Sequence, residues 1–224
     1  MQGLDGVTAV PVRVGRLLRS VEPTTVGVAL AVVLAVTGAA GAAQALQGPV
    51  EAEGAPAPEG VLGLFYLDGE YNVAAAVSAG IWLLAALSLY AAGRMLEAGH
   101  GRFVWTGLAA ALVYLGLDEG LKLHERVEGE TAVDWQLLFA PLLIASALAG
   151  LYVVVRAGPG TPQLLLLAAG GAAVAAQVLE AAQWNGDEPV GPYRALMVPE
   201  EILEPTAAAL IAVAALMLLR ETPS

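Results

Sequence analysis

The stretch QLLFAPLLIASALAGLYVVV, residues 136–155, decides the fold of this chain. It runs for 20 residues between Asp134 and Arg156 without a charged side chain. At 1.5 Å per residue, a helix of that length is roughly 30 Å long, which matches the hydrocarbon thickness of a bilayer. A helix on the surface of a soluble protein would carry polar residues along one face. The stretch therefore predicts a transmembrane helix.

The rest of the chain repeats this pattern. With 58% hydrophobic residues, 14% charged residues and a mean hydropathy of +0.70, its 224 residues are too apolar for a soluble domain. We predict an all-α polytopic membrane protein, a six-helix transmembrane bundle. Its spans are expected at about 26–46, 73–96, 103–125, 135–156, 163–184 and 199–220, after a cytoplasmic lead at 1–25 and with an acidic extracytoplasmic loop at 47–72. Within the third span, Gly116-x-x-x-Gly120 predicts close approach of a neighbouring helix.

Basic residues are distributed unevenly over the two sides of this bundle. One side has seven arginines, namely Arg13, Arg16, Arg19, Arg94, Arg102, Arg156 and Arg220. The other side has Lys122, Arg126 and Arg194. Because Lys and Arg are retained in the cytoplasm while acidic residues contribute little to topology, we expect both termini to be cytoplasmic in a multi-pass plasma-membrane protein. Most of the net charge of −11 then lies outside.

Composition also excludes several classes of protein. The chain has no cysteine, so disulfides, thiolate metal sites and thiol nucleophiles are excluded. No basic patch exists to neutralise phosphates, so the expected partner is the lipid bilayer and not nucleic acid. The first span has an alternative interpretation as a signal peptide cleaved after Ala45, because arginines, an apolar run and small residues follow one another there. The length of the run at 26–46 favours a retained helix.

Acidic residues occur at a similar depth in three of the predicted spans. Asp118 follows Arg102 by 16 residues, and Glu204 precedes Arg220 by 16 residues. Glu180 lies about 18 residues into the fifth span. These separations correspond to rises of roughly 24, 24 and 27 Å, just short of the ~30 Å hydrocarbon thickness. The sequence therefore predicts a layer of carboxylates just inside the extracytoplasmic edge of the membrane.

The third span ends in LDEGLKLHER, residues 117–126. If the helix continues through this motif, Asp118, Lys122 and Glu125 share one face and Glu119 lies on its flank. Because Lys122 follows Asp118 by four residues, a self-neutralised helix end is one interpretation. The other is a functional site, since the dipole disfavours acids at a helix C-terminus.

The sixth span opens with VPEEILEP, residues 198–205. A proline followed by two glutamates is typical of a first helical turn, where acids oppose the positive end of the dipole, and this accounts for Glu200 and Glu201. Glu204 lies deeper, one turn from Glu200 on the same face. Pro205 has no N–H for the Glu201 carbonyl, so we expect irregular backbone here, which membrane helices tolerate where a cavity is lined.

Carboxylates in these spans outnumber the cations near them. At most three basic side chains face six carboxylates. Charges inside a membrane are costly, so a further cation or protonation is implied. Carboxylates suit Ca or Mg, and with one histidine they suit Zn, Fe or Mn. We predict a site for one of these divalent metals. Its candidate ligands are Asp118, Glu119, Glu180, Glu201 and Glu204.

Three functions are compatible with such a site. The first is a metal-dependent membrane enzyme at the outer leaflet, in which the metal activates water and His124 or Glu125 is the catalytic general base. The second is a cation or proton-coupled transporter, although the cytoplasmic halves of the spans have few polar residues. The third is a structural or partner-binding membrane protein whose acids pair internally. The ligand is expected to be a small molecule, a lipid or a cation, and no fingerprint for an organic cofactor is present.

The chain resembles an uncharacterised family of prokaryotic six-span membrane proteins. The resemblance lies in Leu117-Asp118-Glu119 followed by His124-Glu125, in the lone glutamate of the fifth span, and in Glu200-Glu201-x-x-Glu204. It covers the second half of the chain best and implies six spans and a pairing of these motifs. It implies no reaction. Pro205 stands where the family is expected to have an ordinary apolar or small residue.

Overall fold

The computed structural model describes residues 14–45, 64–65, 67, 72–131, 135–185, 188–190 and 193–221. After a short helix at residues 14–19, the elements are α2 (Pro23–Ala45), α3 (Val73–Leu96), α4 (His100–Leu121), α5 (Leu123–Thr131), α6 (Trp135–Ala157), α7 (Thr161–Gln183), a two-residue ladder of β1 (Trp184–Asn185) with β2 (Glu188–Pro189), and α8 (Tyr193–Glu221). Six of these helices are long and apolar enough to cross a membrane. The predicted all-α six-helix bundle is therefore confirmed.

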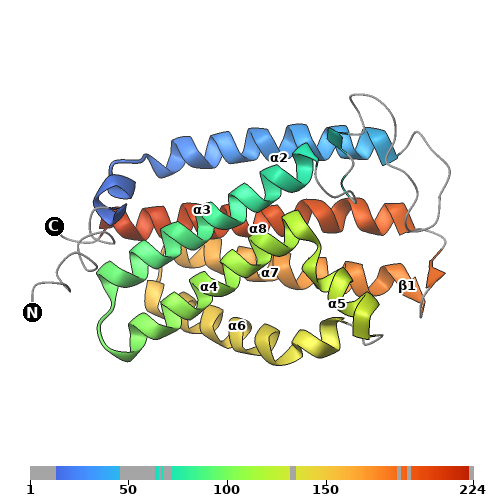
Figure 1. Ribbon diagram of the computed structural model, residues 1–224. Coiled ribbons are helices and arrows are strands. Elements are labelled where there is room, and N and C mark those ends of the chain that lie inside the picture. The colour runs from blue at the N-terminus through green and yellow to red at the C-terminus, as the bar shows by residue number, and fades with distance from the viewer. Residues whose placement is uncertain are drawn as a thin grey trace, which may run out of the picture.

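The helices lie roughly side by side along one long direction (Figure 1). The start of α2, the end of α8 and the turns between α3 and α4 and between α6 and α7 lie at one end of the bundle (Figure 1). Helix α5 and strand β1 lie at the opposite end. An even number of spans accounts for this arrangement, because each long helix reverses the direction of the chain.

Helix α8 forms the centre of the bundle. It packs against α7, α3 and α2, whereas α6 contacts α4 and α7 at the periphery. Its buried face consists largely of small side chains, including Ala207, Ala208, Ala212 and Ala215. Small residues let helix backbones approach closely, which is how helices gain contact energy in a bilayer without a hydrophobic driving force between them. The alanine-rich half of α8 is therefore the part that packs against the neighbouring helices.

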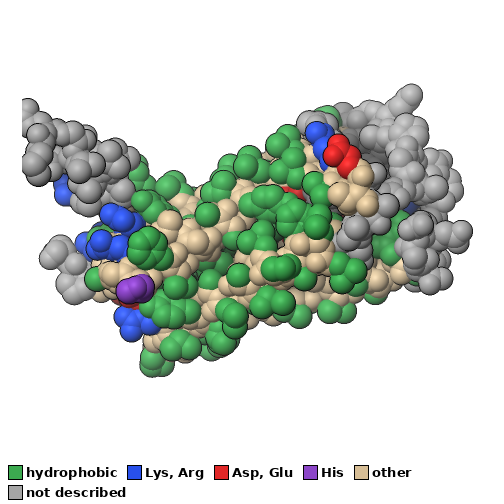
Figure 2. All heavy atoms as spheres, turned by 60° about the horizontal axis from the view of Figure 1, so that its bottom comes forward, with side chains coloured by type: hydrophobic (Ala, Val, Ile, Leu, Met, Phe, Trp, Pro, Cys, Tyr) green, Lys and Arg blue, Asp and Glu red, His purple; other side chains and the backbone are tan. Residues whose placement is uncertain are grey.

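The outer surface of α6 is apolar. Val153 is its one buried residue, while Leu137, Ile144, Leu148 and Val155 are each more than half exposed. Figure 2 shows hydrophobic side chains over much of the described surface, with Lys, Arg, Asp and Glu confined mainly to its two ends. A continuous exposed apolar surface of this extent would aggregate in water and is stable against lipid tails. The bundle is therefore built for a bilayer.

Glycines bring α3 and α4 into close contact. A Cβ added at Gly116 would lie 3.0 Å from Trp82 Cβ and 3.2 Å from the Ala79 carbonyl oxygen, which confirms the close approach predicted for the third span. At the other end of this pair, Gly93 lies directly against the Trp105 side chain, with no room for a Cβ. The backbone of each helix lies so close to side chains of the other that only glycine fits at these two positions.

Charged contacts join the helices at the end of the bundle where α2 starts and α8 ends. Glu97, at the C-cap of α3, binds Arg156 of α6 at 2.5 Å, and its carbonyl accepts a hydrogen bond from Arg102 of α4 at 2.7 Å. Glu22 pairs with Arg220, which connects the start of α2 to the end of α8. These contacts fix the positions of the helices relative to one another along the long direction of the bundle.

Two helix boundaries differ from the sequence prediction. The third helix ends at Leu121, because Lys122 adopts the left-handed conformation (φ 47°, ψ 51°) and α5 starts at Leu123. Most of the sequence HERVEGET, residues 124–131, is polar, so it is better placed at the membrane surface than in a continuing span. The expected common face of Asp118, Lys122 and Glu125 is therefore wrong, because the left-handed residue changes the helical phase.

The last helix begins at Tyr193, six residues before Pro199. Pro199 and Pro205 both lie inside α8, and no acidic residue is in its first turn. The interpretation of Glu200 and Glu201 as first-turn acids is wrong for this reason. Neither residue is explained by the helix dipole, so both need another account.

Candidate metal centre

Three glutamates come together between α7 and α8. One carboxylate oxygen from each of Glu180, Glu200 and Glu204 lies within 4.8 Å of the other two. Glu200 and Glu204 are four residues apart, so they project from the same face of α8. That face meets Glu180 because α7 and α8 are extensively packed neighbours. We call these three residues the Glu180–Glu200–Glu204 cluster.

The spacing within this cluster is compatible with one shared ion. Two oxygens bound to the same ion are at most twice the metal–oxygen distance apart, which is roughly 4.0–4.2 Å for Mg²⁺ and up to about 5.2 Å for Ca²⁺. A spread of up to 4.8 Å therefore fits a calcium-sized ion as it stands. A smaller ion needs the side chains to move inward by several tenths of an ångström. Three carboxylates form a hard-oxygen donor set suited to either ion.

Glu180 is held in place by two donors. Trp135 Nε1, at the start of α6, donates to Glu180 Oε1 at 2.9 Å. Gln177 Nε2, one turn earlier on α7, donates to Glu180 Oε2 at 3.1 Å. Each carboxylate oxygen thus receives one N–H. Hydrogen bonds of this kind fix the orientation of a ligand and stabilise its charged form.

Glu200 is buried next to another buried polar side chain. Its side chain is 8% exposed, and that of Gln183 on α7 is 3% exposed. The Gln183 amide lies beside the Glu200 carboxyl, but its Nε2 makes no hydrogen bond of normal geometry within the described part of the chain. Gln183 is therefore the polar side chain of α7 that faces Glu200.

Glu119 extends the acidic group from α4. Its carboxyl group lies against that of Glu204 and within electrostatic range of Lys122 and Asp118. Glu201 is near Glu204 as well, but its side chain points to another side of α8, toward α2 and α3. Five glutamates from three helices therefore meet at one level of the bundle.

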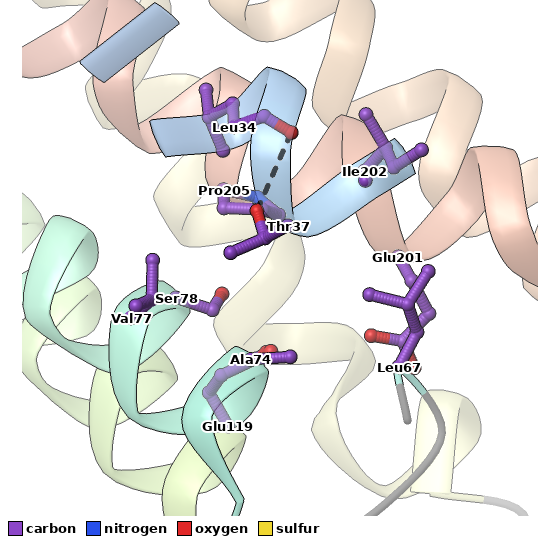
Figure 3. Close-up of a pocket in the computed structure, with 11 residues that line it drawn as sticks. Leu34, Thr37, Leu67, Ala74, Val77, Ser78, Glu119, Glu201, Ile202 and Pro205 are labelled. Carbon is purple, nitrogen blue, oxygen red and sulfur yellow. Dashed lines mark hydrogen bonds between the residues drawn. The ribbon is translucent and has the colours of Figure 1, made fainter. Parts of the chain in front are cut away.

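A small cavity adjoins these carboxylates on the side of α2 and α3 (Figure 3). Glu119 and Glu201 line it together with Ser78 of α3, Thr37 of α2 and Pro205 of α8. The volume of the cavity that the centre of a water molecule can occupy is about 20 Å³. That is room for a water molecule or a small ion, and too little for an organic substrate.

The structure places the predicted metal ligands in two groups, and Asp118 belongs to neither. Glu180 and Glu204 belong to the cluster, whereas Glu119 and Glu201 line the adjacent cavity. Asp118 is buried near Glu119 but is in neither group. His124 and Glu125 belong to α5, and their side chains lie outside what the structure describes, so their catalytic role stays a prediction.

Sequence reasoning missed Glu200, Gln183 and Trp135. The sequence pattern assigned Glu200 to the first turn of the last span, but α8 starts two turns before it. The spacing of four residues between Glu200 and Glu204 was the signal that could have placed Glu200 among the ligands. Gln183 follows Glu180 by three residues, and polar residues at that spacing on an apolar helix were a second signal. The hydrogen bond of Trp135 to Glu180 joins two helices and has no local signal.

An all-α bundle of six membrane-spanning helices, with a partly buried carboxylate cluster between two of them, defines an integral membrane protein of the polytopic class. Within that class, the chain belongs to the family of a domain of unknown function, DUF8692, whose sequence profile matches residues 25–219. The match includes every residue of the cluster, all of α3, α4, α6 and α7, and all but the first two residues of α2 and the last two of α8. Neither the curated proteins nor the solved structures contain a match to this chain. The predicted prokaryotic distribution and pairing of motifs stay predictions.

Proposed function

We propose that this protein binds a divalent cation within the membrane, through Glu180, Glu200 and Glu204, and uses it as a metal-dependent enzyme at the outer leaflet. The observation that carries the proposal is the convergence of three carboxylates from two packed helices to within 4.8 Å. Like charges this close inside a bundle repel one another, and a divalent ion converts that repulsion into attraction.

The chemistry available to such an ion is activation of a bound water molecule. Glu180, oriented by Trp135 and Gln177, would be a fixed ligand. His124 or Glu125 would accept the proton of the water, as the sequence suggests. The substrate would approach from the membrane surface, because the cavity next to the cluster is too small to contain it.

Transport of a cation is the second candidate. A site inside a bundle favours it, but the interior between the cluster and the opposite end of the bundle is apolar. Of the five buried polar or charged residues in the described part of the chain, Ser78, Asp118, Gln183 and Glu200 are at the level of the carboxylates, and Ser88 lies deeper. A conducting path needs polar groups along its length. Enzymatic use of the ion therefore fits the interior better.

The orientation of the protein is part of the proposal. Six described arginines are at the end of the bundle where α2 starts and α8 ends, and Lys122, Arg126 and Arg194 are at the other end. By the positive-inside rule, the termini are cytoplasmic and the cluster is near the extracytoplasmic surface of the plasma membrane.

Metal analysis of the purified full-length protein tests the proposal. We expect bound Ca²⁺, Mn²⁺ or Mg²⁺ after equilibrium dialysis, and loss of that ion in the double variant Glu200→Gln, Glu204→Gln. Glu221→Gln is the matched control, because Glu221 is exposed at the other end of the same helix. Equal metal content in the double variant and the wild type would refute the site and favour internally paired acids.

Thermal unfolding supplies a second readout with a definite sign. In a chelator, the double variant should be more stable than the wild type, because two repelling charges have been removed. In excess metal the order should reverse, since binding at 100 times Kd stabilises the wild type by about 2.7 kcal/mol. Hydrolase assays on ester, amide and phosphoester substrates, with and without metal, then separate the enzyme from the inert protein. Cation flux into proteoliposomes would instead establish the transporter.

A further inference from the structure

A short helix at residues 14–19 packs onto the end of the bundle where α2 starts and α8 ends (Figure 1). Leu18 is 9% exposed and belongs to the hydrophobic core, and Val14 and Val21 pack against that core. A Cβ added at Gly15 would lie 3.0 Å from the Sδ atom of Met95 on α3. The short helix is therefore a fixed part of the bundle.

The turn between the short helix and α2 is held by local hydrogen bonds. The backbone N–H and the hydroxyl of Ser20 donate to the Leu17 carbonyl at 3.1 and 2.7 Å. The Val21 N–H donates to the Leu18 carbonyl at 3.1 Å. These bonds satisfy carbonyl groups that the end of a helix leaves without a partner. They also fix which face of the short helix is turned away from the bundle.

That outward face combines a cation with a large apolar side chain. Residues 14, 15 and 18 face the bundle, so at 100° per residue Arg16 and Leu17 lie on the opposite side. Leu17 is 69% exposed, and Arg16 is exposed as well. On a helix at a membrane surface, a leucine inserts toward the acyl chains while a neighbouring arginine stays among the headgroups.

Positive charge is in excess at this end of the bundle. Six described arginines lie there together with three glutamates, Glu22, Glu97 and Glu221. Two of the glutamates are already paired, Glu22 with Arg220 and Glu97 with Arg156. The carboxylates of the described chain therefore leave part of this positive charge without a counterion.

Two of these arginines lie beside the contact between the short helix and α3. Arg16 follows Gly15, and Arg94 precedes Met95 in the last turn of α3. Arg16 is exposed and Arg94 is half-buried. Neither side chain makes an ion pair or a hydrogen bond within the described part of the chain. An anion bound by both would remove the repulsion between two neighbouring cations.

We propose that this end of the protein binds the phosphate headgroup of an anionic phospholipid through Arg16 and Arg94, with Leu17 inserted between acyl chains. Guanidinium groups donate N–H pairs that match the geometry of a phosphate. By the positive-inside rule the lipid belongs to the cytoplasmic leaflet, whose negative surface potential attracts basic segments. The inference is independent of the metal centre, because no residue of the Glu180–Glu200–Glu204 cluster takes part in it.

The test measures lipid binding to the purified full-length protein in dodecyl maltoside, by native mass spectrometry and by thermal shift. The probes are phosphatidylglycerol, phosphatidylcholine and glycerol 3-phosphate. We expect phosphatidylglycerol to bind more tightly than phosphatidylcholine, and glycerol 3-phosphate, which has no acyl chain, not to bind. Arg16→Gln and Arg94→Gln should each weaken phosphatidylglycerol binding about fivefold and leave phosphatidylcholine unchanged. Leu17→Ser should weaken both lipids.

Arg126→Gln is the matched control. It removes the same charge from an exposed position on α5, at the opposite end of the bundle. This variant should keep the wild-type affinity for phosphatidylglycerol. Arg16 and Leu17 are exposed and contribute nothing to the core, so a loss of binding in their variants is not a folding defect.

Each alternative outcome has a distinct meaning. Equal affinity of the wild type for the two phospholipids would overturn the inference. Unchanged phosphatidylglycerol binding in both arginine variants would overturn it as well, as would an equal loss in Arg126→Gln, because net charge alone would then account for binding. Binding of glycerol 3-phosphate as tightly as the lipid would replace the lipid by a soluble phosphate compound.

Discussion

Trp135 helps to orient the Glu180 side chain. Its indole N–H donates to Glu180 from a different helix, whereas Gln177 donates from the same one. Trp135→Phe keeps most of the apolar contact and removes this bond. We expect metal affinity to fall by about 10-fold or more, as for other residues that orient a ligand. Isothermal titration calorimetry measures this change, with Trp184→Phe as the control, because Trp184 packs on Tyr193. Equal losses in the two variants would contradict the orienting role of Trp135.

Lys122 is the one non-glycine residue with a positive φ in the described part of the chain. Its left-handed conformation costs roughly 1–2 kcal/mol for a residue with a Cβ. Lys122→Gly should therefore be more stable than Lys122→Gln by about 1 kcal/mol in thermal unfolding. Both variants remove the positive charge near Glu119, so their difference isolates the backbone contribution. If Lys122→Gly were the less stable of the two, the strain would not exist.

At this scale, the sequence predicted the acidic layer but not its grouping. The depth of Glu180 and Glu204 follows from counting residues along straight helices, which the fold preserves. The separation of Glu119 and Glu201 from the cluster depends on how α4 and α8 are rotated about their axes. That rotation is set by packing between helices, and no local pattern encodes it.

Glycine positions on α3 allow a test of helix packing. A Cβ at Gly93 would overlap the rigid Trp105 side chain, whereas nothing lies within 4 Å of a Cβ at Gly80. Gly93→Ala should destabilise the protein by about 1–3 kcal/mol, because α3 and α4 must separate. Gly80→Ala, the same substitution on the same helix, should stabilise it by about 0.5–1 kcal/mol through lower chain entropy. Unfolding in detergent measures both, and the same sign for the two would contradict the contact.

The pairing of α2 with α8 should depend on pH. The Arg220 guanidinium donates to Glu22 and lowers the pKa of that carboxyl below its usual 4.5. A lowered carboxyl pKa stabilises the folded protein above pH 4.5, and this stabilisation is lost as the pH falls through the lowered value. The wild type should therefore exceed Glu22→Gln in Tm at pH 7 and match it under acid. The difference is small and decreases with salt, because both side chains are about half exposed. A difference that grew under acid would contradict the sign.

At the scale of elements, hydropathy predicted all six long helices, because each must match the thickness of the bilayer. Two boundaries were missed for a physical reason. The end of α4 is set by one left-handed residue, Lys122, whose conformation is not typical of lysine. The start of α8 lies before Pro199, because a proline inside a helix removes one hydrogen bond and does not prevent the preceding turns.

Labelling of single cysteines tests the orientation of the whole molecule. The chain has no cysteine, so each introduced thiol is unique. Ala98→Cys lies in the exposed turn between α3 and α4, and Thr131→Cys lies at the exposed end of α5. In intact cells, a membrane-impermeant maleimide should modify only Thr131→Cys, and permeabilisation should add Ala98→Cys. The reverse pattern would place the carboxylates on the cytoplasmic side.

Most helices that follow one another along the chain are neighbours, namely α3 and α4, α4 and α6, α6 and α7, and α7 and α8, because short connections keep successive helices together. Chain order does not account for the central place of α8, which also contacts α2 and α3. That position follows from the alanines of α8, whose small side chains let three helices approach it at once.

Helix α2 packs chiefly against α8, and its residues Leu34, Thr37 and Gly38 form one wall of the cavity that Glu119 and Glu201 line. Removal of the first span by a signal peptidase would take this wall away from the cavity. Lipid acyl chains would then contact the carboxyl groups of Glu119 and Glu201. Cleavage of the first span and an intact cavity are therefore incompatible in this fold. An intact amino-terminal segment, read by mass spectrometry of the protein from membranes, is the expected result.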